Sequence, residues 1–136
     1  MEALLQDAIA SGRRINFDQL RKIYIKVLTD NIEFYDVMAQ RTLKRSPKHV
    51  LLLHENDLAA LYISDLVASL KNKGWSIISV ENAYTDPIAK IEPDTFFLGQ
   101  GRVAAIAYAK GDPGPFGKWE SELELEKLFE AEKVFE

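Results

Sequence analysis

The chain has 136 residues, 47% hydrophobic and 28% charged, a composition typical of one folded domain with a buried core. It has no cysteine, which excludes thiolate catalysis, cysteine-based zinc sites and disulfide frameworks. The net charge of -4 predicts no nucleic-acid partner. No apolar run is long enough to span a membrane, and the N-terminus lacks the order of a signal peptide. We expect a single soluble domain over residues 1–136, cytoplasmic if expressed as given.

The first third of the chain is predicted to be helical. Residues 2–10 read as a short helix. Asn16 with Gln19 three positions later is a capping-box pattern, and the apolar residues after it recur at helical spacing. We expect a long amphipathic helix from about 17 to 44. A basic cluster near its end is interpreted as a complement to the helix dipole. The cluster consists of Arg41, Lys44, Arg45 and Lys48.

The stretch HVLLLHEND, residues 49–57, indicates a buried strand with a polar exit. Its four consecutive branched apolar residues do not alternate with polar ones, which is typical of a parallel strand covered on both faces. A helical pattern follows, ending at Gly74, and then a second apolar stretch, WSIISV. The order predicts an α/β fold with a short parallel β-α-β unit, with strands at about 48–54 and 75–80.

The last third is predicted to be loop-rich, with two further helices at about 101–111 and 119–132. Gly99, Gly101 and Ala104 fit a loose dinucleotide-binding pattern, but the βα units that should follow are missing. We interpret these glycines as a tight turn into a helix.

The two histidines could suggest a metal site. His49 and His54 are five residues apart, and an odd separation on a strand places side chains on opposite faces. They cannot share one ion within such a strand, and the chain has no HxxxH or HExxH pattern. The sequence therefore predicts no metal site.

His54 has two interpretations. At the C-terminal end of a buried parallel strand it could act as a general acid or base. Alternatively, it only leaves the core while Asn56 or Asp57 caps the next helix. Its position alone does not decide between them.

The segment SPKHVLLLHENDLAALYISDLVASLKNKGWSIISVENAYTDPIA resembles the C-terminal half of polysaccharide deacetylases, carbohydrate esterase family four. The similarity continues through EPDTFFLGQGRVAAIA to LEKLFEAEKVF and so covers most of the chain. The resemblance implies a helix-rich, partial (β/α)-barrel-like fragment. In this family a leucine-x-histidine motif lines the acetyl pocket and supplies the general acid. The resemblance therefore implies that Leu52 forms a wall of the acetyl pocket and that His54 is the general acid.

The chain departs from the family where the metal chemistry resides. Family enzymes hold a divalent metal such as zinc with one aspartate and two histidines, and use a second aspartate as the base. Residues 1–24 contain no T-F-D-D, HxxxH or R-x-P motif. We therefore expect no cofactor in this chain and no carbohydrate N-deacetylase activity from it alone.

Three functional hypotheses follow. The chain is an inactive deacetylase-like fragment, a small self-associating α/β binding module, or the acid-supplying half of a deacetylase completed by another chain. A half barrel leaves strand edges and apolar faces uncovered, which predicts a homo-oligomer formed through helix 17–44 or the strand edges. A carbohydrate is the expected ligand class if the old pocket persists.

Overall fold

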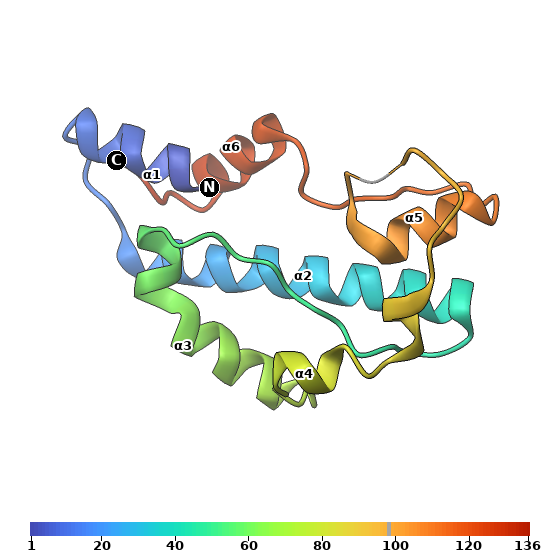
Figure 1. Ribbon diagram of the computed structural model, residues 1–136. Coiled ribbons are helices and arrows are strands. Elements are labelled where there is room, and N and C mark those ends of the chain that lie inside the picture. The colour runs from blue at the N-terminus through green and yellow to red at the C-terminus, as the bar shows by residue number, and fades with distance from the viewer. Residues whose placement is uncertain (98) are drawn as a thin grey trace. The chain divides into compact units, whose positions relative to one another are not determined.

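The computed structural model describes residues 1–97 and 99–136, and its regular elements are helices (Figure 1). They are α1 (Glu2–Ala10), α2 (Phe17–Leu43), α3 (Asp57–Asn72), α4 (Val80–Ala83), the 3-10 helix η1 (Pro87–Lys90), α5 (Gly101–Ala109) and α6 (Glu122–Ala131). Within the described residues, no helix combines the length and the apolar character needed to cross a bilayer.

The chain divides into two compact units. Unit 1 contains α1, the N-terminal part of α2, α3 and α6, and unit 2 contains the rest of α2, α4, η1 and α5. The bounds of unit 1 are Met1–Thr29, Leu53–Ser76 and Trp119–Glu136, and those of unit 2 are Asp30–Leu52 and Ile77–Lys118. The single domain expected from the sequence stays a prediction.

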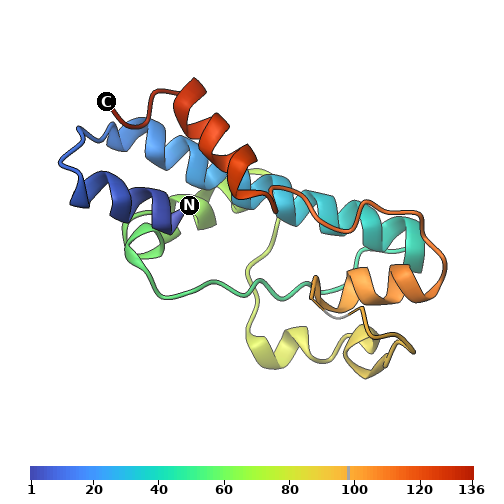
Figure 2. The ribbon, with the colours of Figure 1, turned by 90° about the horizontal axis from the view of Figure 1, so that it is seen from above.

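In unit 1, α1 and α6 lie on one side of the N-terminal part of α2 and α3 lies on the other (Figure 1). Seen from above, α6 lies over α2 and α1 lies to one side of its first turns (Figure 2). Every fourth residue of α3 is buried, which forms an apolar stripe along one face of the helix. These residues are Leu58, Tyr62, Leu66 and Leu70. The ring of Tyr62 packs 5.8 Å from that of Tyr24, and its hydroxyl donates to the carbonyl oxygen of Phe17 at 3.1 Å.

In unit 2, the second half of α2 packs against α5. The buried centre consists of Met38 from α2 with Ala104 and Ala107 from α5, where the small alanines allow the two helices to approach closely. Aromatic side chains surround it. They are Phe34, Tyr35, Phe97 and Phe116. The positive φ of Gly101, 81°, lies at the start of α5 and confirms the predicted glycine turn into a helix.

The longer predicted helices are confirmed, with ends shifted by a few residues at most. Asn16 caps α2 by accepting a hydrogen bond from the amide of Gln19 at 3.2 Å, as the capping pattern predicts. Gly74, with φ of 90°, follows α3 as its expected stop.

The predicted α/β class is wrong for this structure. Residues 48–54 and 75–79 have neither helix nor strand, Val80 begins α4, and none of the described residues forms a strand. The β-type contact present is an isolated antiparallel bridge between Ile15 and Phe135. The β-α-β unit and the truncated barrel are therefore absent from the described chain. The pattern failed because it reports apolar character, whereas a strand also needs a neighbour for its backbone hydrogen bonds.

Packing of α3 provides a stability test. Leu66 is 1% exposed and Leu61, on the same helix, is 50% exposed. We expect Leu66→Ala to lower the free energy of unfolding by about 2–5 kcal/mol, because it removes buried methyl groups and leaves a cavity. Denaturant unfolding followed by helical circular dichroism measures this. The matched variant Leu61→Ala should stay within about 1 kcal/mol of the wild type, and equal losses in both variants would contradict the packing described.

Candidate functional site

The structure places both residues singled out by the deacetylase resemblance at the surface. Leu52, the predicted pocket wall, lies between α2 and α3 and is 84% exposed. His54, the predicted general acid, is also exposed. The two residues belong to different units. Neither lines either of the two hollows described in unit 1, one beside Asn16 and one beside Phe129. Their roles stay predictions.

The polar residues after His54 stabilise the start of α3. The side chain of Asn56 accepts a hydrogen bond from the amide of Ala59 at 2.9 Å and caps α3. Asp57 accepts one from Gln6 at 2.8 Å, which joins α3 to α1. The prediction that Asn56 or Asp57 caps the next helix is confirmed for Asn56. This cap does not use the imidazole of His54, which can therefore have a further role.

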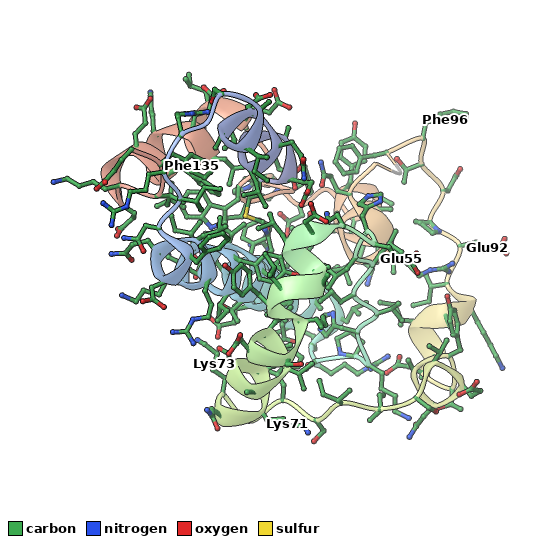
Figure 3. The ribbon with its side chains drawn as sticks, turned by 90° about the vertical axis from the view of Figure 1, so that its left-hand side faces the viewer. Glu55, Lys71, Lys73, Glu92, Phe96 and Phe135 are labelled. Carbon is green, nitrogen blue, oxygen red and sulfur yellow. The ribbon has the colours of Figure 1, made fainter. Side chains whose placement is uncertain are left out.

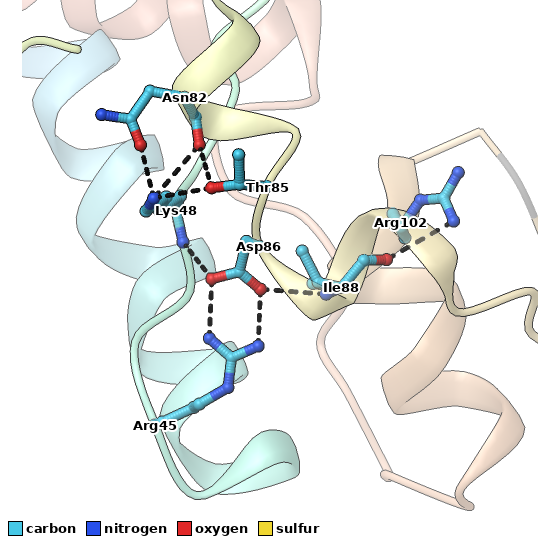
Figure 4. Close-up of polar contacts among 7 residues, drawn as sticks. All are labelled: Arg45, Lys48, Asn82, Thr85, Asp86, Ile88 and Arg102. Carbon is cyan, nitrogen blue, oxygen red and sulfur yellow. Dashed lines mark hydrogen bonds and ion pairs between the residues drawn. The ribbon is translucent and has the colours of Figure 1, made fainter. Parts of the chain in front are cut away.

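The most tightly bound polar group described in unit 2 is the carboxylate of Asp86, which is 7% exposed (Figure 4). The guanidinium of Arg45 donates to its two oxygens at 2.6 and 2.8 Å. Backbone amides of Ile88 and Lys48 donate to the same oxygens at 2.9 and 3.0 Å. Four donors converge on one carboxylate, and the bidentate geometry with arginine is the strongest arrangement that such a pair offers.

These donors stabilise the ionised form of Asp86. The hydrogen bonds from Arg45 outweigh the opposing effect of burial and, with the amides of Ile88 and Lys48, hold the pKa of Asp86 far below its ordinary value. The carboxylate therefore stays charged over the ordinary pH range and anchors the chain on both sides of it.

Lys48 extends this network to α4. Its ammonium donates to the carbonyl oxygen of Asn82 at 3.1 Å, to the side-chain oxygen of the same residue, and to the hydroxyl of Thr85 at 2.9 Å (Figure 4). Through its amide and its ammonium together, Lys48 joins the stretch after α2 to the segment that contains α4 and Asp86. Two parts of the sequence more than thirty residues apart are thus held together in unit 2.

Exposed apolar side chains lie on the two segments that this network joins. We call this set the apolar surface. It consists of Val50, Leu51, Leu52, Ile77, Ile78, Val80 and Tyr84. All seven belong to unit 2. Single exposed apolar residues are ordinary, but seven of them on two segments that one network joins make this part of unit 2 a candidate interaction site.

The backbone of the stretch that begins in this surface forms no hydrogen bonds within the described protein. Within the described part of the chain, residues 50–54 form no hydrogen bond through their amides or carbonyls. Figure 1 shows this stretch as a drawn-out link that leads to α3. A run of free amides and carbonyls beside exposed apolar side chains is a template for pairing with another polypeptide segment.

A second carboxylate fixes the start of the stretch. Asp36 on α2 binds the imidazole of His49 at 2.9 Å and accepts hydrogen bonds from Ser46 and Gln40. Burial by itself would raise the pKa of Asp36, but these hydrogen bonds outweigh it and keep the pKa below its ordinary value. This cluster holds His49 against α2 immediately before the apolar residues begin.

Sequence reasoning missed Asp86 as an organising residue. It had assigned Arg45 and Lys48 to the helix dipole, whereas both bind the segment 82–86. One local signal existed, because an aspartate before Pro87 is typical of a capped turn, and the side chain of Asp86 does cap η1. The pairing with Arg45, 41 positions away, has no local signature.

No group of three or more histidine, aspartate or glutamate side chains within residues 1–97 and 99–136 is arranged to hold a metal ion.

Comparison of the chain with protein-family models, with curated proteins and with solved structures gave no match. The resemblance to polysaccharide deacetylases therefore stays a prediction from the residues quoted above.

The Asp86 network predicts a specific acid sensitivity. Because the pKa of Asp86 is lower in the folded state than the unfolded value of about 3.9, its ionised form contributes stability that is complete above about pH 5. That contribution is lost as the pH falls towards the folded pKa. We expect the free energy of unfolding to fall between about pH 5 and pH 2, and to fall less steeply in Asp86→Asn.

Denaturant titrations at a series of pH values measure this difference. Arg45→Gln removes the main cause of the lowered pKa and should flatten the profile in the same direction. Profiles of equal steepness in the wild type and Asp86→Asn would show that Asp86 does not contribute in this way.

Proposed function

We propose that this chain functions by self-association, and that the apolar surface of unit 2 is the part that binds a second copy. The observation that carries this proposal is that consecutive apolar residues, which are typical of a buried segment, are exposed to solvent here. Leu52, at the centre of the run, is 84% exposed, and Val50 is 59% exposed. Covering such side chains is favourable by roughly 25 cal/mol for each Å² of apolar area removed from water.

Three features favour binding of a second copy over an apolar surface that simply faces solvent. The surface contains several large aliphatic side chains, the stretch 50–54 forms no backbone hydrogen bond within the described chain, and two carboxylate networks hold its N-terminal end at Lys48 and His49. A binding segment held in place at one end loses less conformational entropy on association than a free loop. The Asp86 and Asp36 networks therefore favour binding as well as folding.

A second candidate function comes from the deacetylase resemblance, and the exposed imidazole of His54 is the observation that favours it. In this proposal His54 is the general acid towards a leaving amine of a carbohydrate, in an assembly whose other chain supplies the divalent metal and the base. A lone general acid contributes only about 10²–10⁴-fold to a rate, and amide hydrolysis of this kind also needs a polarised carbonyl and an activated water. The isolated chain is then inactive by itself.

Light scattering during size exclusion tests self-association. At micromolar concentration we expect the wild type to have about twice the 15.4 kDa mass of one chain. Leu52→Lys should shift the mass towards that of a monomer, because a lysine within the interface would have to be desolvated. Leu61→Lys introduces the same charge at an exposed leucine outside the apolar surface and should remain a dimer. A monomeric wild type contradicts the proposal.

An assay on chitin oligomers tests the second candidate. We expect no deacetylation above background by the isolated chain with added zinc or cobalt, since the sequence lacks the family's metal and base motifs. Acetate release or product mass measures turnover. Turnover that disappears in His54→Ala would show that this chain is a complete deacetylase, and His49→Ala is the control for loss of the other histidine.

A further inference from the structure

We infer that Lys48 is a positioning residue for self-association, because its ammonium sets which face of α4 points outward. This inference rests on the proposed self-association and names a residue that controls the binding surface without belonging to it. All the residues concerned belong to unit 2.

The apolar surface is built from two stretches of chain that are far apart in the sequence. Residues 50–52 contribute three of its seven side chains, and residues 77–84 contribute four. A partner can cover all of them together only while the two stretches are held in a fixed relation to each other. The contacts that fix this relation therefore determine how strongly a second copy binds.

One face of α4 carries exposed apolar side chains. Val80 begins the helix and Tyr84 follows its last residue, and both are exposed. Successive residues of an α-helix are turned by about 100°, so residues four positions apart share a face. Asn82, two positions from each of them, lies roughly on the opposite face.

Lys48 binds this opposite face of α4. Its ammonium donates to the side-chain oxygen of Asn82, to the carbonyl oxygen of the same residue at 3.1 Å, and to the hydroxyl of Thr85 at 2.9 Å (Figure 4). An ammonium has three donors, and these three oxygens use all of them. Since Lys48 holds the face with Asn82, the side chains of Val80 and Tyr84 point away from it and stay available to a partner.

The Asp86 network cannot replace these bonds. The carboxylate of Asp86 binds the amide of Lys48 at 3.0 Å and the guanidinium of Arg45, which fixes the chain at a single residue beyond the end of α4. One point of attachment leaves the preceding helix able to turn about it. The bonds from the ammonium to Asn82, within α4, add the second point that defines the direction of the helix.

The buried centre of unit 2 does not involve the ammonium of Lys48. That centre consists of Met38 packed against Ala104 and Ala107. Removing the ammonium should therefore leave the helices folded while α4 adopts several orientations. A second copy then has to order α4 when it binds, and this loss of conformational entropy weakens the association.

Sedimentation equilibrium at a series of concentrations tests this inference by measuring the dissociation constant of the dimer. Lys48→Met keeps the length of the side chain and removes its charge and its donors. We expect it to raise the dissociation constant about tenfold or more, because the apolar side chains are no longer presented together. Lys48→Arg retains a cation with several donors and should restore a dissociation constant within about threefold of the wild type.

Two control variants separate positioning from general effects. Lys44→Met is the same substitution near the end of α2, where the ammonium donates to the carbonyl oxygen of Arg41 at 2.9 Å. Phe96 belongs to unit 2 but not to the apolar surface, and its exposed ring points into solvent (Figure 3). Lys44→Met and Phe96→Ser should both leave the dissociation constant unchanged. Circular dichroism checks that every variant keeps the helix content of the wild type.

The outcomes separate this inference from the proposed function. A dimer that is weakened in Lys48→Met, restored in Lys48→Arg and unaffected in both controls supports the inference. A wild-type dimer that Lys48→Met does not weaken, or that Lys48→Arg or either control weakens as much, overturns it while self-association stands. Loss of helix content in Lys48→Met also overturns it, because Lys48 would then be needed for folding. A wild-type monomer overturns both.

Discussion

The carboxylate of Asp86 is the constraint on which unit 2 depends. A buried carboxylate is costly unless hydrogen bonds and an opposite charge compensate it, and Asp86 receives both from Arg45 and two backbone amides. Satisfying this one group requires the chain after α2 and the chain before η1 to meet. The apolar residues on either side of the meeting point then have little freedom to retreat into the core, because their neighbours are already fixed. The exposed apolar surface thus lies on the two segments that the buried charge holds together.

Much of the helical structure could be predicted from the sequence, because its signals are local. In α3, the residue that caps the first turn, the apolar residues at every fourth position and the glycine after the last turn all lie within twenty residues. The same holds for the cap of α2 at Asn16. A helix satisfies its own backbone, so its sequence needs no knowledge of distant segments.

The stretch after α2 could not be predicted in the same way. Four consecutive branched apolar residues indicate burial, but whether they form a strand depends on a neighbouring segment that no local pattern specifies. The pairing of Asp86 with Arg45 is likewise non-local, and the basic residues near the end of α2 suit either a helix dipole or a carboxylate. For this reason the candidate residues chosen from the sequence, Leu52 and His54, were located only by resemblance, and the network that holds their segment was missed.

The conflict between the sequence and the structure over residues 50–54 is informative. Leucine and valine side chains in a run of this kind gain most when covered on both faces, yet Val50, Leu51 and Leu52 are exposed and the described chain supplies no backbone hydrogen bond to residues 50–54. Both observations are explained if another polypeptide covers these residues. In that case the exposure of Leu52 in one copy and its burial in an assembly are two states of the same residue. The position of His54, two residues away, would then be defined by the assembly, and any chemistry of its imidazole would depend on association first.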